Sequence, residues 1–404
     1  MGYDAIIVGG GLARSTLAVE LSRAGRRVLI LEREIRFKDR VRGENMLPWG
    51  VAAVRRLGLV EDLLAAGAHQ PRSWTTYMAG TPLSNRDLQK TTSHGEVSLN
   101  IYHPAMQEAL LERALASGTD VKRGATVTHV AAASGENPAV TFEHEGKQET
   151  IKAKVVVGAD GRTSQLRSWG GFTAQRNLDM LTIAGTLMQG SDVPDDAIHL
   201  CLGPGIATLL APLGQKRARV YFVYPALPAR RGLSGKDKVP EFVNCCQSTG
   251  IPASWVAEAQ CIGPLAEFDG ADRWVPSPSR NGVALIGDAA ASSDPSWGCG
   301  LSLTLLDVEH LANALRATDD WAAALKLDAA EHDEYYSALH RILVDDRTHV
   351  DFRPRSRRAP RPCSAPHALR SSRIPRLNRP RPLRSVRRTC TQARARTGLV
   401  SCPS

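Results

Sequence analysis

The chain has 404 residues, of which 43% are hydrophobic, and its formal net charge of +10 comes from 51 Lys and Arg against 41 Asp and Glu. This composition excludes a wholly disordered or fibrous protein, and the length predicts two or three packed lobes. No apolar run approaches the roughly 18 residues that a membrane span needs. The start, Met1-Gly2-Tyr3-Asp4, shows no basic leader, so we expect a cytoplasmic protein with no membrane span.

The N-terminal segment has the order of a dinucleotide-binding unit. The pattern predicts a strand at 3–8, a glycine turn, a helix at 17–24 and a second strand at 27–31. Gly9 permits a tight turn, Gly11 lets backbone N–H groups approach a pyrophosphate, and the helix N-terminus favours its negative charge. Glu32 follows the second strand, where an acid accepts hydrogen bonds from the adenosine ribose. A purely structural glycine turn is the alternative.

One position departs from this motif. The third glycine of G-x-G-x-x-G would fall at residue 14, but the chain has Arg14. That glycine normally lets the helix and strand pack closely. A long charged side chain there needs either an outward path or a shifted helix. The alternative is that Arg14 reaches the phosphates, but we expect weakened cofactor binding instead.

Two further strand-turn motifs follow along the chain. The first is an apolar strand at 154–157 that breaks into Gly158-Ala159-Asp160-Gly161. The second is an apolar strand at 283–286 that ends in Gly287-Asp288 and continues through 294–301 into a predicted helix at 303–315. Each segment alone is an ordinary strand-turn-helix unit. The three motifs together, in this order and spacing, are hard to explain by chance.

With these motifs the chain resembles the class A flavoprotein monooxygenases, the para-hydroxybenzoate hydroxylase-like group of FAD enzymes, over about residues 3–343. The resemblance implies an α/β fold with a Rossmann-like FAD-binding lobe of the glutathione reductase type and a substrate lobe with a mainly antiparallel β-sheet. The expected boundaries are 1–73, 101–177 and 276–346 for the FAD-binding lobe with its C-terminal helices, 74–100 and 178–275 for the substrate lobe, and 347–404 for a disordered basic tail.

Carried over residue by residue, the resemblance implies one long cofactor site. In that family the first motif holds the ADP part of FAD, the Asp-Gly motif contributes to FAD and reduced nicotinamide binding, and the Gly-Asp motif bonds the ribityl chain. Glu32 and Arg33 would meet the adenosine end, and Arg42 the pyrophosphate. The implied cofactor-binding residues of these segments and of the loop beside the flavin ring are Gly9, Gly11, Arg14, Glu32, Arg33, Arg42, Asp160, Gly161, Gly287, Asp288, Pro295, Gly298, Gly300 and Leu301.

Three more residues belong to this implied site. The segment 102–111 resembles the family helix whose first turn supplies an Arg or Gln to the ribityl chain, and here the aligned position is His103, with Gln107 one turn later. Which of the two takes the role is open. The equal alternatives are a helix-start histidine bonded to local backbone and a glutamine on a solvated face. Val127 stands where the family often bonds the adenine through the main chain.

The resemblance implies a FAD-dependent monooxygenase that hydroxylates an aromatic or polyketide-like small molecule. Reduced nicotinamide, NADH or NADPH, would give a hydride to FAD, the reduced flavin would capture O2 as a C4a-hydroperoxide, and its distal oxygen would pass to the substrate. Because the flavin carries the oxygen chemistry, we assign no catalytic acid or base and no metal. Tyr221, Phe222 and Tyr224 on one predicted strand either line a pocket or, as we favour, pack in the core.

Four alternatives share part of this pattern. A flavin-dependent halogenase has the same FAD lobe, but this chain lacks the Trp-x-Trp-x-Ile-Pro segment of that family. A reductase of prenyl double bonds is also built on this lobe. A degenerate flavoprotein would have lost FAD because of Arg14 and the altered C-terminus. A nucleic-acid-binding protein would depend wholly on the tail, and we expect no nucleic acid partner.

The tail differs in composition from the rest of the chain. Residues 347–404 hold 16 Arg, no Lys and one acid, together with 8 of the 24 Pro. The net charge of this stretch is +15 and that of the whole chain is +10, so the residues before it carry a net charge of −5. Its few aliphatic residues predict disorder. It is either an evolved arm for nucleic acid or anionic lipid or, as we favour, a GC-rich reading frame translated out of register. The five cysteines before it form no CxxC pair, as in a reducing compartment.

Overall fold

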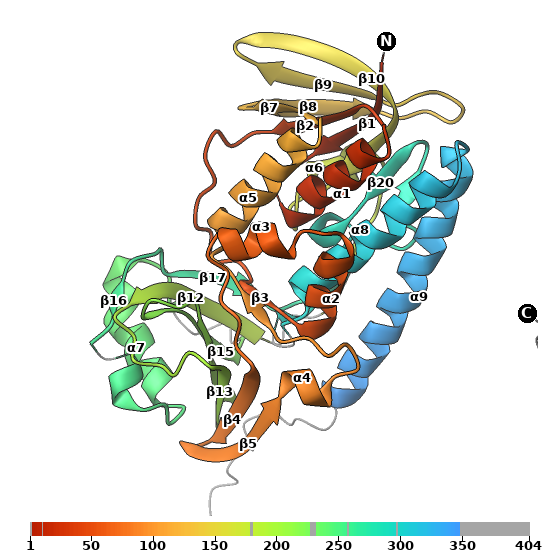
Figure 1. The fold of residues 1–404 in the computed structure, drawn as a ribbon. Coiled ribbons are helices and arrows are strands. Elements are labelled where there is room, and N and C mark those ends of the chain that lie inside the picture. The colour runs from red at the N-terminus through yellow and green to blue at the C-terminus, as the bar shows by residue number, and fades with distance from the viewer. Residues whose placement is uncertain are drawn as a thin grey trace, which may run out of the picture. The chain divides into compact units, whose positions relative to one another are not determined.

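The computed structural model describes residues 2–9, 11–177, 181–226, 232–256, 258–295 and 298–347. They belong to one compact unit, Met1–Pro354, which is drawn in Figure 1. The tail predicted at 347–404 lies outside the described residues except for Arg347.

A mainly parallel sheet forms the centre of the first lobe. Its strands, in spatial order, are β19 (Ser279–Arg280), β20 (Val283–Leu285), β10 (Lys147–Gly158), β1 (Tyr3–Val8), β2 (Val28–Glu32) and β7 (Asp120–Arg123). The pairings from β20 to β7 are parallel, and β19 is antiparallel to β20. The apolar run at the end of β1 is buried on both faces, as expected for an inner strand of a covered parallel sheet.

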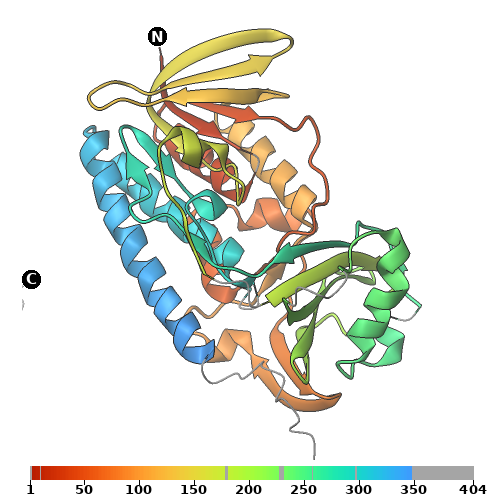
Figure 2. The ribbon, with the colours of Figure 1, turned by 180° about the vertical axis from the view of Figure 1, so that it is seen from behind.

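Helices cover one face of this sheet, and a β-meander covers the other (Figures 1 and 2). The helices are α1 (Leu12–Arg23), α2 (Pro48–Arg56), α3 (Val60–Ala65), α5 (His103–Ala116), α8 (Gly300–Ala317) and α9 (Trp321–Arg347). Helix α1 contacts both α5 and α8. The opposite face packs against β8 (Thr126–Ala131), β9 (Ala139–His144) and α6 (Gln165–Trp169). Ile7 and Leu17 belong to the helical core layer, and Ile6 and Phe142 to the other.

A second sheet forms the other lobe. Its strands, in order, are β16 (Gln260–Cys261), β12 (Leu181–Gln189), β15 (Arg217–Pro225), β14 (Ile206–Pro212), β13 (Ala197–Gly203), β4 (Ser73–Met78) and β5 (Thr81–Asp87), with β17 (Ala266–Asp269) also on β12. Only the β4–β13 pair among these described strands is parallel. The predicted α/β fold with a mainly antiparallel second sheet is confirmed.

The two faces of this second sheet differ. Tyr221 and Val223 point to one face, in an apolar cluster with Ile183. Phe222 and Tyr224 point to the other face, in the cluster packed against α7 (Val239–Gln247). The short helices η1 (Lys236–Lys238) and η2 (Ala253–Trp255) flank α7 in the chain. The three neighbouring aromatic residues therefore divide between two faces, because side chains alternate along a strand.

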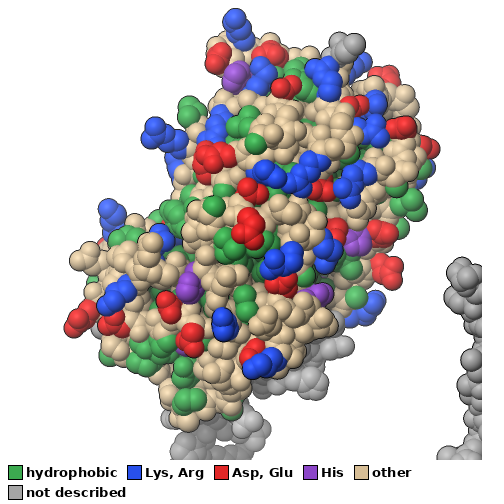
Figure 3. Space-filling model, in the orientation of Figure 1, with side chains coloured by type: hydrophobic (Ala, Val, Ile, Leu, Met, Phe, Trp, Pro, Cys, Tyr) green, Lys and Arg blue, Asp and Glu red, His purple; other side chains and the backbone are tan. Residues whose placement is uncertain are grey.

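Short elements lie outside the two large sheets. They are β3 (Asn45–Met46) paired with β6 (Leu99–Asn100), the three-stranded set β11 (Gln175–Arg176), β18 (Arg273–Trp274) and β21 (Ala291–Ser292), the helix α4 (Leu88–Thr91), and the turn η3 (Gly287–Ala289). Positive and negative side chains are interspersed on the face in Figure 3, in keeping with the small net charge of the sequence before the tail. Among the described residues, no helix combines the length and apolar character that crossing a bilayer requires.

Candidate functional site

The three motifs meet at the carboxyl edge of the first sheet. Val8 of β1 is in register with Leu31 of β2 and with Gly158 of β10, and Gly158 is in register with Leu285 of β20. The turns that follow these parallel strands therefore emerge at one edge, where ligands of open α/β sheets bind.

Contacts around two glycines show how closely the turns approach. Gly9 has φ +125°, and a Cβ there would lie 2.3 Å from the Ala159 carbonyl oxygen and 2.7 Å from the Asp160 Cα. The first motif thus passes directly against the second. A Cβ at Gly287 would lie 3.5 Å from the Ala13 Cβ on the first turn of α1, which brings the third motif to the same place.

The start of helix α1 is arranged to receive an anion. Its N-cap is Gly11, which offers no capping side chain, and its first turn holds no acid. A Cβ added to Gly11 would meet no other atom within 4 Å. The free N–H groups of this first turn and the helix dipole favour a phosphate group at such an end.

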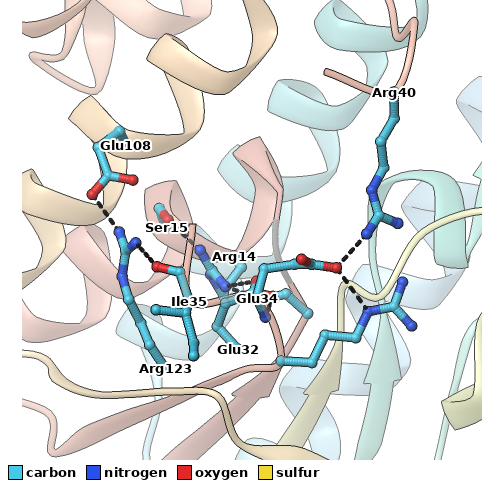
Figure 4. Close-up of polar contacts among 10 residues, drawn as sticks. Arg14, Ser15, Glu32, Glu34, Ile35, Arg40, Glu108 and Arg123 are labelled. Atoms are coloured by element: carbon cyan, nitrogen blue, oxygen red, sulfur yellow. Dashed lines mark hydrogen bonds and ion pairs between the residues drawn. The ribbon is translucent and has the colours of Figure 1, made fainter. Parts of the chain in front are cut away.

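Arg14 takes an inward path from this turn (Figure 4). Its side chain is 0% exposed, and its Nη1 lies 2.5 Å from Glu32 Oε2 and also donates to the Gly9 carbonyl oxygen. Burial lowers the pKa of Arg14, and the neighbouring Glu32 carboxylate opposes that shift. Of the two predicted accommodations, the outward path was wrong, because Glu32 supplies a buried counter-charge at the end of the adjacent strand; the shifted helix stays a prediction.

A second arginine lies beside this pair and was not predicted from the sequence. Arg123, at the end of β7, donates to the Ile35 carbonyl oxygen at 2.7 Å and to Glu108 Oε1 at 2.5 Å. The Phe37 ring lies 5.0 Å from the Arg123 guanidinium carbon and 5.8 Å from that of Arg14. The predicted Arg33 is instead 66% exposed and lies 3.7 Å from Glu34.

The Asp-Gly motif has a structural task of its own. Asp160 Oδ2 accepts the backbone N–H groups of Gln165 and Leu166, at 2.8 and 3.2 Å, and so caps α6. Its Oδ1 is buried and has no hydrogen-bond partner. Gly161 follows in the turn. One oxygen of Asp160 is thus committed to the fold, and the other remains available to a hydroxyl group.

The Gly-Asp motif is held from behind by the C-terminal helices. The Gly287 N–H donates to Asp307 Oδ2 of α8 at 2.7 Å, and Asp307 Oδ1 lies 3.1 Å from His332 Nδ1 of α9. Asp288 is only partly buried. Burial lowers the pKa of Arg42, and Asp288 is near enough to oppose that shift. The structure thus brings the predicted Arg42 and Asp288 together.

The loop predicted to lie beside the flavin ring is described in part. The Gly298 N–H donates to the Pro295 carbonyl oxygen at 3.0 Å, and residues 296 and 297 lie outside the described set. Helix α8 begins at Gly300, and no side chain caps its N-terminus. Leu301 packs against the helical core layer. The loop therefore ends in a second uncapped helix start.

His103 bonds to Gly43 and Glu44, which lie 60 and 59 residues earlier in the chain. Its Nδ1 donates to the Gly43 carbonyl oxygen at 3.1 Å, and its N–H donates to Glu44 Oε1 at 2.9 Å. Burial lowers the pKa of His103 to about 4, so the ring is neutral at pH 7. Gln107 follows one turn along α5. Val127 lies on β8, two residues beyond Ala125, whose N–H donates to the Glu32 carbonyl oxygen at 3.0 Å.

A buried ion-pair network joins the second sheet to the segment that carries Arg42. Arg219 of β15 is 0% exposed and donates to both oxygens of Glu44, at 2.8 and 3.0 Å, and to Asp39 at 2.8 Å. Burial opposes its charge, but the bonds to Glu44 raise the pKa of Arg219. The Tyr221 hydroxyl donates to the Arg42 carbonyl oxygen at 2.7 Å. No sequence motif predicted this network, whose members lie far apart in the chain.

The hollows in the second lobe lie apart from the motifs. A hollow of about 490 Å³ is lined by residues of β4, β5 and β13, among them Tyr77 and His199. None of its lining residues belongs to the three motifs. Within the described residues no cluster of His, Cys, Asp and Glu has the arrangement of a metal site.

The buried Asp328 of α9 leads to a prediction about how the stability of the protein depends on pH. Burial, with repulsion from Asp307, raises the pKa of Asp328 from 3.8 to about 7. The folded state therefore keeps a proton that the unfolded state releases between about pH 4 and pH 7, and this group lowers stability as the pH rises through that window. Nearby His332 acts in the same direction at higher pH, because Asp307 raises its pKa against the effect of burial.

We expect Asp328→Asn to reduce the loss of thermal stability between about pH 5 and about pH 8. The measurement is the melting temperature across this range by circular dichroism, with the exposed Asp192→Asn as the control. An unchanged pH dependence in Asp328→Asn would show that this carboxyl group titrates in the same range in both states.

The comparisons with known proteins cover most of the chain. A model of the FAD binding domain family matches residues 2–339. Digeranylgeranylglycerophospholipid reductase 2 of Methanococcoides burtonii is 26% identical over 321 residues, which are 78% of this chain and 75% of that protein. The 6-methylpretetramide 4-monooxygenase of Streptomyces rimosus is 25% identical over 338 residues, covering 75% and 73%. The structure of the myxobacterial chondrochloren halogenase CndH is similar at a TM-score of 0.73 and 21% identity, covering 85% and 82%.

Proposed function

Because the chain belongs to the FAD binding domain family, we propose that it is a FAD-dependent monooxygenase that hydroxylates an aromatic or polyketide-like small molecule with NADH or NADPH and O2. The single observation that carries this proposal is the meeting of the three turns at Gly9, Asp160 and Gly287 along one sheet edge. An extended cofactor is held by several turns in a row. Three loops with unrelated roles would have no reason to meet along one edge.

The residues from the pyrophosphate to the flavin end fit a bound FAD. Asp160 keeps one buried oxygen without a partner, and a Cβ at Gly11 or Gly300 would meet no other atom within 4 Å. The partly buried Asp288 would bond the ribityl chain, and Arg42 beside it would meet the pyrophosphate. At the adenosine end the fit is incomplete, since Glu32 is bonded to Arg14.

When bound, FAD would supply the redox chemistry, accepting a hydride and activating O2. The protein would supply binding and orientation. The uncapped starts of α1 and α8 would stabilise negative charge on the pyrophosphate and on the flavin ring edge. The ion-pair network of Arg219, Glu44 and Asp39 would fix the segment that carries Arg42. His103, neutral and tied to Gly43, would position that same segment rather than transfer protons.

The second sheet would cover the substrate. Its face with Tyr221 and Val223 also carries Leu200, Leu209 and Phe268, which are only partly buried. A partly exposed apolar and aromatic face of this kind favours a flat apolar substrate. This is why we propose an aromatic or polyketide-like molecule.

The test is substrate-dependent oxygen uptake by the purified chain loaded with FAD. Loading is checked by flavin absorbance near about 450 nm. We expect NADH or NADPH oxidation and O2 consumption to rise together when a phenolic or polyketide-like substrate is added, with formation of the hydroxylated product. Reduction of FAD without any substrate-dependent oxygen uptake across both substrate classes would contradict the proposal.

A second candidate is a reductase of prenyl double bonds. The specific observation in its favour is the match to the reductase of Methanococcoides burtonii, which spans 78% of this chain. A reductase would transfer reducing equivalents to an alkene under strictly anaerobic conditions. Anaerobic turnover of a geranylgeranyl lipid would favour it, and chloride-dependent product formation would favour halogenation instead.

A further inference from the structure

We propose that Arg14 occupies the place at Glu32 that the adenosine ribose of FAD requires, so that this chain binds FAD through a site whose adenosine end is closed. This inference rests on the proposed function, since it concerns the same cofactor. It adds a residue that opposes binding, at the position where the motif otherwise has glycine.

Both oxygens of the Glu32 carboxylate already accept a hydrogen bond. Oε1 accepts the Glu34 N–H at 2.7 Å, and Oε2 accepts Arg14 Nη1 at 2.5 Å. The side chain is 2% exposed, so little of it is open to another donor. Ribose hydroxyls bind this acid by donating to its oxygens. They therefore compete directly with a charge-assisted hydrogen bond, which is about twice as strong as a neutral one.

Arg14 also bonds to the glycine turn that precedes α1. The same Nη1 donates to the Gly9 carbonyl oxygen, and Nη2 lies 3.4 Å from Ser15 Oγ. The guanidinium thus bridges the turn after the first strand to Glu32 at the end of the second strand, and Figure 4 shows Arg14 beside Glu32. A bound ribose at Glu32 would have to displace this bridge.

The buried guanidinium is not itself fully satisfied. Arg14 Nε is buried without a hydrogen-bond partner, and Arg123 places a second positive charge next to it. An unpaired buried donor is costly, so Arg14 is held here by Glu32 rather than by an ideal pocket. The opposite outcome, in which Arg14 turns to bind the pyrophosphate, predicts the reverse effect of its removal.

The decisive experiment measures equilibrium binding of FAD and of ADP to the full chain and to Arg14→Gly. FAD binding is followed by the quenching of flavin fluorescence and ADP binding by calorimetry. We expect Arg14→Gly to bind FAD about 10- to 100-fold more tightly than the unsubstituted chain, the range of one charge-assisted hydrogen bond. ADP should gain by a similar factor, because it carries the same ribose but no flavin.

Three matched variants locate the effect. Arg14→Ala should reproduce most of the gain, and Lys38→Ala, which removes an exposed charge near Glu34, should produce none. Adding Glu32→Gln to Arg14→Gly should abolish most of the gain. Without ligand, Arg14→Gly should melt at a lower temperature than the unsubstituted chain, because Glu32 loses its partner, and FAD should restore the difference.

The outcomes separate the two proposals. Equal or weaker FAD binding by Arg14→Gly, with the unsubstituted chain binding FAD well, would overturn this inference and leave the proposed function intact. Failure of both proteins to bind FAD at any concentration up to about 1 mM, while both remain folded by circular dichroism, would overturn both proposals.

Discussion

Gly9→Ala is expected to destabilise the protein by roughly 2–5 kcal/mol, the sum of a strained backbone and an overpacked contact. The new Cβ would lie 2.3 Å from the Ala159 carbonyl oxygen, and Gly9 has φ +125°. Because the clash is with backbone of the turn that follows β10, no side-chain movement relieves it. The effect is measured as the free energy of unfolding in urea without added cofactor.

Gly11→Ala is the matched control for this prediction. Gly11 has φ −111°, and its Cβ would meet no atom within 4 Å. We expect the two alanine variants to differ sharply in stability although they are two residues apart. A Gly9→Ala protein as stable as Gly11→Ala would mean that the first and second motifs are not in contact.

Arg219→Leu is expected to cost about 3–5 kcal/mol, the usual penalty for breaking a buried ion pair by removing one partner. The substitution would leave the buried carboxylates of Glu44 and Asp39 without their shared cation. The loss should be smaller at about pH 5 than at about pH 8, because burial raises the pKa of Glu44 and its neutral form needs no cation.

Two further variants test this interpretation. Lys216→Leu removes an exposed ion pair with Asp192 in the same strand region and should change stability by about 0.5 kcal/mol or less. Adding Glu44→Gln to Arg219→Leu should recover part of the loss, since one unpaired charge is removed. Urea unfolding at both pH values measures these effects. Equal costs for Arg219→Leu and Lys216→Leu would contradict the network.

Much of the fold was predictable because its signals are local. The glycine turn, the two later strand-turn motifs and the acid at the end of β2 each lie within a short segment, and together they indicated an FAD-binding protein. The comparisons confirm this, because a model of the FAD binding domain family matches residues 2–339. The mainly antiparallel second sheet followed from the resemblance to the class A monooxygenases. The residue roles at the cofactor site, including those of Arg33, Gln107 and Val127, stay predictions.

The start of helix α1 shows why local patterns fail in places. The pattern predicted a helix at 17–24, but α1 spans Leu12–Arg23. Arg14, Ser15 and Thr16 are polar and gave no apolar periodicity, yet all three are buried. They are buried because the helix starts at the sheet edge between two strands' turns, and this environment is set by the fold rather than by the local sequence.

The polar networks could not be predicted for a similar reason. Arg219 and Glu44 are separated by 175 residues, and nothing in either segment marks the other as its partner. The capping of α6 by Asp160 was also missed, because the same aspartate belongs to the motif that indicated cofactor binding. The Ser164 that also caps this helix is the only nearby hint that the turn has a structural task.

The most direct test of the account is a crystal structure of Arg14→Gly grown with FAD. We predict electron density for one extended cofactor along the edge of the first sheet, with its ribose hydroxyls at Glu32, its pyrophosphate at the start of α1, and its ribityl chain beside Asp160 and Asp288. Density for FAD bound at any place that does not touch all three turns would contradict it.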